Sequence, residues 1–287
     1  MEPFLSFIIP YHNEPEALLQ ACLESIQKLP LERDEAEIIL VDDGSESAPS
    51  LPLEGIKYVR QEQAGLSVAR NTGIGQARGR YIQFVDADDC LIPSAYRFVL
   101  KQLQMERGDV VMFRMTTKYK ENSPTHSPVY YSSEHFLLHH NLRAAACGYA
   151  FRKEILGDLR FRPGLLHEDE LFTPQLLLRA KCIQEVYAAA YFYRQHEGTI
   201  TSSKSQEKVQ KRLNDMHFII NELHSLGNPL LERKVRQFTV DYLQKTFTLT
   251  HSLKELKRRK RELRQEGFLP LPHRLYSLRY LLASFLF

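Results

Sequence analysis

Three carboxylates occur within four positions where the sequence reads Asp86-Ala87-Asp88-Asp89. They follow an apolar run, residues 81–85, that is predicted to be a buried strand. Because like charges this close repel one another, the cluster would cost stability unless a cation offsets it. Carboxylate oxygens are hard ligands, which favours Mg²⁺ or Mn²⁺ shared with phosphate oxygens. The alternative is an acidic loop that only caps a neighbouring element.

A second acidic cluster, residues 168–170, precedes a helical pattern and contains Asp169. A carboxylate at this point could take the proton from an attacking hydroxyl, as a general base does. It could equally be a cap that stabilises the N-terminal end of the helix. The residues alone leave both interpretations open.

Polar residues also follow the two strands predicted nearest the N-terminus. Residues 10–14, Pro-Tyr-His-Asn-Glu, end the first strand, and Tyr11 offers a flat ring on which a nucleobase could stack. Residues 42–45, Asp-Asp-Gly-Ser, end the second strand and suit hydrogen bonds to a base or a ribose. A strand end with a helix cap, and an ordinary acidic turn, are the alternatives.

Two further segments carry groups suited to phosphate. Residues 63–73 combine glycine, serine and a predicted helix start with Arg70, an arrangement that could cradle a phosphate. Arg194 and His196 follow a predicted strand and could close over a diphosphate. The glycines of residues 73–79 miss the dinucleotide fingerprint by one position and lie at a helix end rather than after a strand. No P-loop sequence occurs, so a P-loop kinase or ATPase is not supported.

These segments need a scaffold that brings them together, and short β-rich runs alternate with helical patterns through the first 115 residues. Strands are expected at residues 5–9, 37–41, 56–60, 81–85 and 109–115, and helices at 18–26, 65–77 and 94–105. This order predicts an α/β fold with a mostly parallel sheet flanked by helices. Since such sheets bind ligands at the carboxyl ends of their strands, the polar segments should meet at one edge.

Beyond residue 115 the pattern changes. A turn-rich stretch at residues 122–128 is expected to be a hairpin tip or a lid. A helix is expected at 170–179 and a strand at 183–193. From residue 206 onward the chain is predicted to be helical.

Composition indicates the class of protein. Of 287 residues, 43% are hydrophobic and 25% are charged, as in ordinary globular proteins rather than disordered ones. The four cysteines are far apart, which argues against a zinc site and fits a reducing compartment. No secretory signal and no apolar run of about 18 residues is visible, so we expect a cytoplasmic protein.

Charge is concentrated at the C-terminal end. Residues 251–287 carry nine Lys or Arg and three Glu, a net charge of +6, whereas the rest of the chain carries −3. A basic tail on a slightly acidic body suggests an anionic partner for the tail. Nucleic acid is not expected, because no aromatic residues interleave with these charges.

The same tail is also rich in apolar residues. Leu253, Leu256 and Leu263 share a predicted helix with seven cationic side chains, and an aromatic and leucine-rich segment follows at 275–287. This pattern is typical of a helix that lies in a membrane interface, so residues 253–287 are expected to bind an anionic membrane, on the inner face of the cell membrane. The alternatives are that these helices fold back on the rest of the chain or pair in a homodimer.

Taken together and in order, these motifs resemble family 2 glycosyltransferases, which have the GT-A fold. The resemblance covers residues 4 to about 201, and the ordered set is highly specific although each piece is weak. The matching residues are Phe7-Ile-Ile-Pro-Tyr11 with Asn13 and Glu14, Val41-Asp-Asp-Gly-Ser45, Gly65, Ala69-Arg-Asn71, Gly73, Gly79, Tyr81, Phe84, Asp86-Ala-Asp-Asp89 and Glu168-Asp169.

The resemblance implies a role for each matching position. It implies that Pro10, Tyr11 and Glu14 form the nucleotide pocket and that Asp42 reads the uracil edge. The other implied nucleotide contacts are Arg70, Asn71, Asp86, Ala87, Arg194 and His196, the implied metal ligands are Asp86 and Asp88, and the implied catalytic base is Asp169.

The implied activity is transfer of a sugar from a nucleotide-diphosphate donor, a UDP-sugar above all, to a hydroxyl of a glycan or lipid-linked acceptor. Mn²⁺ or Mg²⁺ would neutralise the leaving diphosphate, and Asp169 would take the proton of the acceptor. One displacement from the opposite face would invert the anomeric centre. The chain would divide into a nucleotide-sugar-binding part (1–115), an acceptor-binding and catalytic-base part of the same GT-A domain (116–205), and a helical, basic C-terminal extension (206–287).

Two other functions compete with this one. A sugar-phosphate nucleotidyltransferase would carry a glycine-rich loop with Lys or Arg directly after the first strand, where this chain has residues 10–14. A catalytically inactive, transferase-like binding module would be expected to lack Asp86, Asp88 or Asp169, and all three are present.

Overall fold

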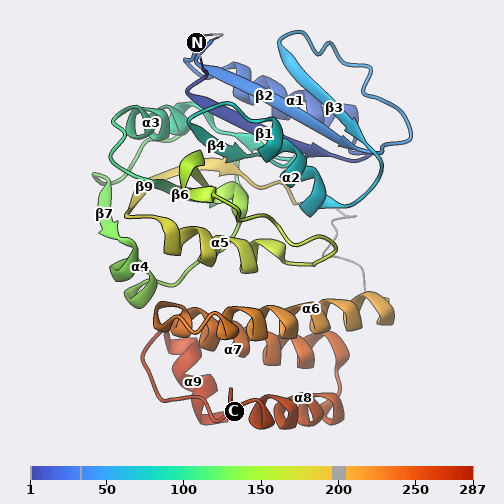
Figure 1. Ribbon diagram of the computed structural model, residues 1–287, viewed down its shortest axis with the longest axis vertical. Coiled ribbons are helices and arrows are strands. Elements are labelled where there is room, and N and C mark those ends of the chain that lie inside the picture. The colour runs from blue at the N-terminus through green and yellow to red at the C-terminus, as the bar shows by residue number, and fades with distance from the viewer. Residues whose placement is uncertain (1, 33, 196–204, 287) are drawn as a thin grey trace.

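The computed structural model describes residues 2–32, 34–195 and 205–286 (Figure 1). Its strands are β1 (Leu5–Tyr11), β2 (Ala36–Asp43), β3 (Ile56–Gln61), β4 (Tyr81–Phe84), β5 (Cys90–Leu91), β6 (Val110–Thr116), β7 (Val129–Ser132), β8 (Tyr149–Arg152) and β9 (Cys182–Phe192). Its helices are α1 (Glu16–Gln27), α2 (Leu66–Gln76), α3 (Pro93–Gln104), α4 (Ser133–His139), α5 (Glu168–Arg179), α6 (Gln206–Ser225), α7 (Glu232–Thr250), α8 (Leu253–Gln265) and α9 (Leu278–Leu286). Three short 3₁₀ turns are η1 (Ala146–Gly148), η2 (Lys153–Leu156) and η3 (Pro229–Leu231).

One nine-stranded sheet runs through the upper part of the molecule. Its order is β3-β2-β1-β4-β8-β6-β9-β5, with β7 paired to β9. The first four strands of this order are all parallel, and β6 is parallel to β9. β8 is antiparallel to both of its neighbours. The predicted α/β architecture, with a mostly parallel sheet and flanking helices, is confirmed.

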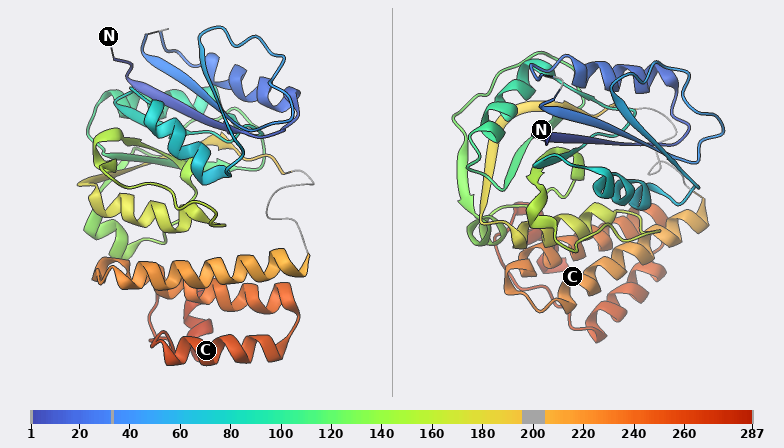
Figure 2. Two further views of the ribbon diagram at one scale, coloured as in Figure 1. Left: turned by 45° about the vertical axis from the view of Figure 1, so that its right-hand side comes forward. Right: turned by 45° about the horizontal axis from the view of Figure 1, so that its top comes forward.

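Helices cover both faces of the sheet (Figure 2). Side chains of α1 and α3 form one core with one face, and side chains of α2, α4 and α5 form a second core with the other. All seven residues of β1 are buried, which explains its continuous apolar run rather than an alternating pattern. At Gly73 in α2, a Cβ atom would lie 2.2 Å from Cγ2 of Ile8. Only glycine therefore lets α2 pack this closely on β1.

The C-terminal helices form a separate layer below α5 (Figure 1). They have their own core, which includes Leu213 of α6, Leu243 of α7, Leu263 of α8 and Tyr280 of α9. Helix α6 contacts α5, and α7 contacts α4. The predicted helical extension is therefore present, and it packs directly on the part of the chain that carries Asp169.

The three leucines of α8 differ in their exposure. Leu263 is buried and Leu256 is partly buried against the helical core, so these two follow the alternative in which the helix folds back. Leu253, at the start of α8, is 63% exposed, and further exposed apolar side chains occur on α9 and on the loop before it. Binding of residues 253–287 to a membrane stays a prediction.

Several elements were not predicted from the sequence. They are β5, β7, β8, α4, η1, η2 and η3, all short. The turn-rich stretch at 122–128 is an irregular connection between β6 and β7. Throughout the described ranges, every helix is too short or too polar to cross a bilayer. The division at residues 115 and 205 stays a prediction.

Candidate active site

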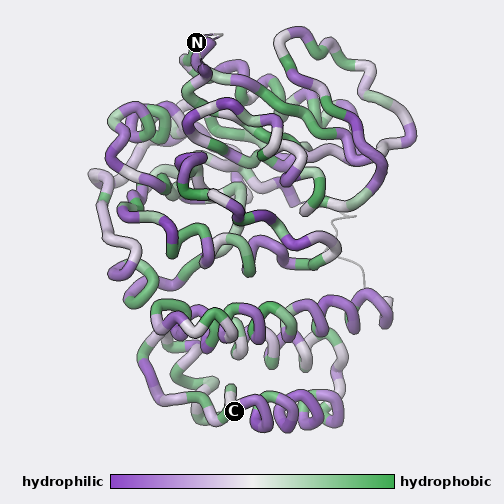
Figure 3. Tube along the Cα trace, viewed as in Figure 1, coloured by the Kyte–Doolittle hydropathy of each residue, from purple (hydrophilic) through white to green (hydrophobic). Residues whose placement is uncertain are grey.

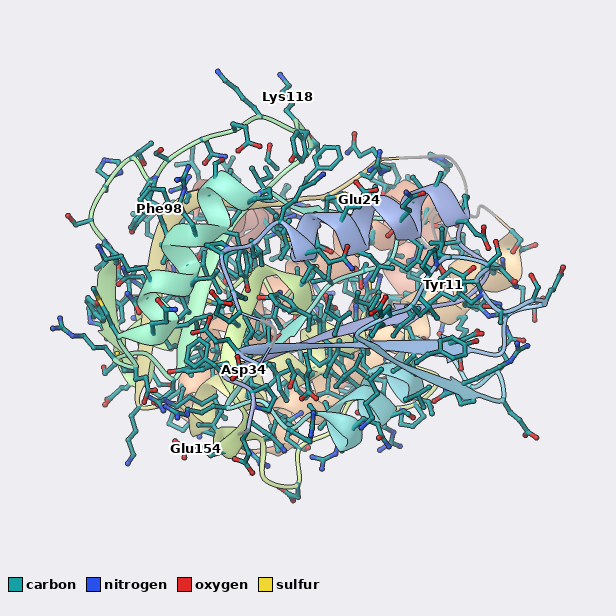
Figure 4. All side chains as sticks on the ribbon, turned by 90° about the horizontal axis from the view of Figure 1, so that it is seen from above. Tyr11, Glu24, Asp34, Phe98, Lys118 and Glu154 are labelled. Carbon is teal, nitrogen blue, oxygen red and sulfur yellow. The ribbon has the colours of Figure 1, made fainter. Side chains whose placement is uncertain are left out.

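The candidate residues gather at the carboxyl ends of the parallel strands. Tyr11 is the last residue of β1, Asp42 lies at the end of β2, and Asp86 follows β4. Figure 4 shows Tyr11 at the end of the strands opposite to Asp34, which precedes β2. The predicted meeting of the motifs at one sheet edge is thus seen in the structure.

Tyr11 and Glu14 close the β1 side of this edge. Tyr11 is only 5% exposed, and its hydroxyl donates to the carbonyl oxygen of Glu14 at 3.2 Å. The Glu14 carboxylate accepts a hydrogen bond from the His12 amide at 2.5 Å. Burial raises the pKa of Glu14, and the carboxylate of Asp88 raises it further. The charges of Glu14 and Asp88 thus influence one another, and nucleotide contacts of Pro10, Tyr11 and Glu14 stay predictions.

Asp42 is fully buried at the end of β2. Its carboxylate accepts hydrogen bonds from the Ser45 amide at 2.8 Å and from the Tyr58 hydroxyl at 2.5 Å. Burial alone would raise the pKa of Asp42, but these hydrogen bonds and the nearby Arg60 lower it overall. Asp42 is thus held ionised as an acceptor, which is what recognition of a uracil N–H would need. That recognition stays a prediction.

The neighbouring Asp43 has a structural role that the sequence did not indicate. Its two carboxylate oxygens accept hydrogen bonds from the amides of Ala64 and Gly65 at 2.8 and 2.7 Å and from the Gln61 side chain at 2.7 Å. These bonds fix the loop that leads into α2. His12 bonds to the carbonyl oxygen of Asp43 at 2.8 Å.

The carboxylates after β4 divide into two groups. Asp89 is fully buried, accepts hydrogen bonds from the Tyr191 hydroxyl at 2.8 Å and the Arg194 amide at 2.7 Å, and anchors the turn. Burial, followed by the charge of Asp86, raises the pKa of Asp89 to about 7. Asp86 and Asp88 are partly exposed.

Asp86 and Asp88 are suited to holding a divalent cation. Both supply hard carboxylate oxygens. In addition to burial, the charge of Asp88 raises the pKa of Glu14, and the charge of Asp86 raises the pKa of Asp89. In residues 2–32, 34–195 and 205–286, no three His, Cys, Asp or Glu side chains converge on one point. A cation bound here would therefore draw further oxygen ligands from the donor diphosphate or from water.

Arg70 connects this carboxylate cluster to the segment that carries Asp169. Its guanidinium donates to Asp86 at 2.9 Å and to Glu168, and it lies over the rings of Phe84 and Phe161. Arg70 is 4% exposed, so its partners in this structure are protein groups. Burial alone would lower its pKa, but Asp86 and Glu168 raise it, which keeps the group charged.

Asn71, the next residue on α2, is also used inside the protein. Its side chain donates to the carbonyl oxygen of Phe161 at 2.8 Å and accepts from the Phe161 amide at 2.9 Å. This reciprocal pair holds the segment that leads to residues 163–170. Contact of Arg70 and Asn71 with the donor stays a prediction.

The first turn of α5 carries three consecutive carboxylates. Glu168 pairs with Arg70, and Glu170 pairs with Lys234 of α7. Asp169 lies between them, and none of the residues with described positions donates a hydrogen bond to its carboxylate. Burial, followed by Glu168 and Glu170, raises the pKa of Asp169. A carboxylate with a raised pKa and no hydrogen-bond donor among the described residues is suited to accept a proton from a bound hydroxyl.

Arg194 lies against the turn after β4. Its Nε donates to the carbonyl oxygen of Asp88 at 3.0 Å, and its guanidinium lies 5.3 Å from the Phe192 ring. Arg194 thus lies beside a predicted metal ligand, and its contact with a diphosphate stays a prediction. His196 lies outside the described residues. Ala87 is buried between Asp86 and Asp88, so only its backbone could meet a nucleotide.

Comparison with known proteins identifies the family to which the chain belongs. Residues 6–160 match the family model of glycosyl transferase family 2, so the chain belongs to that family. It is 24% identical over 249 residues to the glycosyltransferase GlyA of Streptococcus pneumoniae, a match that covers 79% of this chain and 35% of GlyA. It is 26% identical over 237 residues to the glycosyltransferase EpsJ of Bacillus subtilis, covering 74% of this chain and 67% of EpsJ. The chain thus spans about a third of GlyA and about two thirds of EpsJ.

Solved structures share the fold along almost the whole chain. The crystal structure of S. aureus TarS residues 1–349 with UDP-GlcNAc has a TM-score of 0.67 and 21% identity, and the match covers 98% of this chain and 79% of that one. A second structure of TarS 1–349, with UDP, has a TM-score of 0.66. The GT-A fold predicted from the motifs is thus confirmed.

Proposed function

We propose that this protein transfers a sugar from a UDP-sugar to a hydroxyl of a glycan or lipid-linked acceptor, with inversion and with Mn²⁺ or Mg²⁺. The observation that carries the proposal is the bridge made by Arg70, which joins Asp86 to Glu168, the neighbour of Asp169. One guanidinium thus links the turn that carries the carboxylates suited to the donor with the first turn of α5, which carries the carboxylate suited to the acceptor. The TarS structures, whose titles name UDP-GlcNAc and UDP, support a uridine nucleotide donor.

The chemistry follows from these positions. Asp86 and Asp88 would hold the cation, whose charge would offset the charge that develops on the leaving diphosphate. Asp169 removes the proton from the acceptor hydroxyl as that oxygen forms its bond to the anomeric carbon. The bond from this carbon to the diphosphate breaks in the same displacement. Because the acceptor attacks from the face opposite to the leaving group, the configuration at the anomeric carbon inverts.

A donor screen tests this function. Purified protein is incubated with UDP-, GDP- and dTDP-sugars and Mn²⁺, and released nucleoside diphosphate is measured with and without added acceptors. We expect UDP release from one or a few UDP-sugars, and loss of that release in Asp169→Asn when acceptor is present. Formation of pyrophosphate from UTP and a sugar phosphate would instead support a nucleotidyltransferase. Binding of UDP-sugars without turnover under any condition would support an inactive binding module.

We also propose that the enzyme works in the cytoplasm, attached to the inner face of the cell membrane through residues 253–287. All four cysteines are free thiols, which fits a reducing compartment. Leu278, Leu282, Phe285 and Leu286 of α9 are between 62% and 72% exposed. Their spacing places them on one side of a helix at the end of the molecule farthest from β1–β3 (Figure 1).

Basic side chains lie on the neighbouring helix α8. Lys254, Lys257, Arg261 and Arg264 are exposed, and in the part of the chain that the structure describes they form no ion pair. Their spacing also places them on one side of the helix. Figure 3 shows α8 as a strongly hydrophilic helix at the C-terminal end of the molecule. Exposed apolar side chains on α9 together with exposed cations on α8 are the combination that an anionic lipid surface binds. A homodimer through α9 is the alternative.

A further inference from the structure

The C-terminal extension holds the segment that carries Asp169. The Leu166 amide donates to Asp215 of α6 at 2.9 Å. Lys211 of α6 donates to the carbonyl oxygen of Gly164 at 2.7 Å and pairs with Asp215 at 2.7 Å. These contacts fix residues 163–167, which enter α5. The extension is therefore part of the support of the candidate active site.

Lys234 of α7 contacts Glu170, the residue that follows Asp169. Its ammonium pairs with Glu170, donates to the carbonyl oxygen of Leu142 at 3.4 Å and lies 5.3 Å from the Phe238 ring. Its side chain is 8% exposed. Because burial of an unpaired ammonium is costly, the position of Lys234 depends on Glu170 and that of Glu170 depends on Lys234.

Two cations thus approach the first turn of α5 from different sides. Arg70 of α2 pairs with Glu168, whereas Lys234 of the extension pairs with Glu170. Asp169 is left between them as the carboxylate without an ion pair among the described residues.

We propose that Lys234 is a positioning residue for the catalytic base: its ion pair with Glu170 fixes the first turn of α5 and leaves the Asp169 carboxylate directed to the acceptor. This inference rests on the proposed function, in which Asp169 is the base. It makes the helical extension a part of the catalytic machinery rather than only a membrane or packing element.

The charges around Asp169 predict the direction in which its pKa should change when Lys234 is replaced. Burial, followed by two anions on its own helix, raises the pKa of Asp169, and the cations of α2 and α7 lower it. Removing the ammonium of Lys234 should therefore raise this pKa, so that less of the base is ionised at neutral pH. Several titratable or charged groups lie near Asp169: His167, Glu168 and Glu170 of its own segment, Arg70 of α2, Tyr149 of β8, and Lys234 and Asp241 of α7. Asp241 is itself paired with Arg279 of α9.

The test is the pH profile of kcat in the full-length protein for Lys234→Met, Lys234→Arg and Glu170→Gln. In Lys234→Met the acidic limb should move up by about one pH unit, which lowers kcat at pH 7 roughly tenfold and leaves kcat near its normal value at high pH. KM for the donor should change little. Lys234→Arg, which keeps the charge, should restore the limb. Glu170→Gln removes an anion, so it should move the limb in the opposite direction.

Controls separate this inference from the function on which it rests. Lys208→Met, on an exposed residue of α6 without a side-chain contact among the described residues, should leave the profile unchanged. Equal loss at every pH in Lys234→Met, or an unmoved limb in both Lys234→Met and Glu170→Gln, overturns the role of Lys234 while the proposed function stands. Full acceptor-dependent turnover in Asp169→Asn overturns the assignment of the base itself.

Discussion

Arg70 and Glu168, which are 98 positions apart in the sequence, form an ion pair in the protein interior. The same guanidinium donates to Asp86 at 2.9 Å, so one side chain joins the turn after β4 to the first turn of α5. The two parts that we assign to donor and acceptor cannot move apart without breaking this bridge. Its strength should therefore be visible in the stability of the whole fold.

Replacement of Arg70 by Met should lower the free energy of unfolding by about 3–5 kcal/mol, because it leaves Asp86 and Glu168 without their buried cation. Denaturation by urea measures this change. The matched control is Arg78→Met, which breaks a pair with Glu37 in which the arginine side chain is 66% exposed. Such an exposed pair is worth less than about 1 kcal/mol. Similar costs for the two variants would contradict the role given to Arg70.

Asp88→Ala tests the predicted metal site. With this ligand lost, turnover should fall at least about 100-fold, and UDP should bind more weakly, since a cation stabilises the diphosphate. Steady-state kinetics with Mn²⁺, with Mg²⁺ and after EDTA treatment measure the effect, and calorimetry measures UDP binding. Lys208→Met, on an exposed residue of α6, serves as a folding and activity control. Wild-type turnover in EDTA together with unchanged UDP affinity in Asp88→Ala would rule out the metal assignment.

Asp169→Asn tests the base. The amide keeps the shape but cannot take a proton, so kcat should fall by about 10²–10⁴-fold while donor affinity changes little. In the wild type the raised pKa of Asp169 predicts that kcat falls as the pH drops through this pKa, because the carboxylate becomes protonated. The mutant should lack this limb. If Asp169→Asn kept most of its kcat, Glu168 or Glu170 would have to be examined as the base.

Much of the sheet and its motif positions could be predicted from the sequence. Parallel strands bury both faces, so β1 and β4 appear as apolar runs, and the polar residues that end them must meet at one edge. The strong local signals were therefore those of β1, β2 and β4. Short elements such as β8 and η1 gave no such signal, because their few residues take their shape from neighbours distant in the sequence.

The partners of the site residues could not be predicted in the same way. The sequence around Arg70, with glycine near the N-terminus of a helix, predicts a phosphate ligand. Nothing in this local pattern indicates that Asp86 and Glu168 surround the side chain. The same holds for Lys234, whose helix has an ordinary amphipathic pattern. Its pairing with Glu170 depends on how the C-terminal layer packs below α5. This packing brings together segments that are far apart in the sequence, and the periodicity of one helix does not predict which distant segment it contacts.

The last prediction concerns membrane attachment through α8 and α9. The segment after residue 250 contributes Leu263, Leu269 and Tyr280 to a buried core, so truncation near residue 250 would expose that core. Point variants of the full chain are therefore the appropriate test. One variant, Lys254→Gln/Lys257→Gln/Arg261→Gln, removes three exposed cations. A second, Leu282→Ser/Phe285→Ser, removes two exposed apolar side chains of α9.

Co-sedimentation with phosphatidylglycerol and phosphatidylcholine vesicles at low and high salt measures attachment. The wild type should bind anionic vesicles at low salt and detach as salt screens the charges. At about 1 kcal/mol for each cation, the triple variant should lose about 3 kcal/mol, roughly a hundredfold in partitioning. The α9 variant should also bind more weakly, and Lys118→Gln/Lys120→Gln, in the exposed loop before β7, should bind like the wild type. Equal partitioning of all four proteins onto the vesicles, or no partitioning by any of them, would favour the dimer. In that case a concentration-dependent molecular mass that falls only in the α9 variant would identify α9 as the surface through which two chains pair.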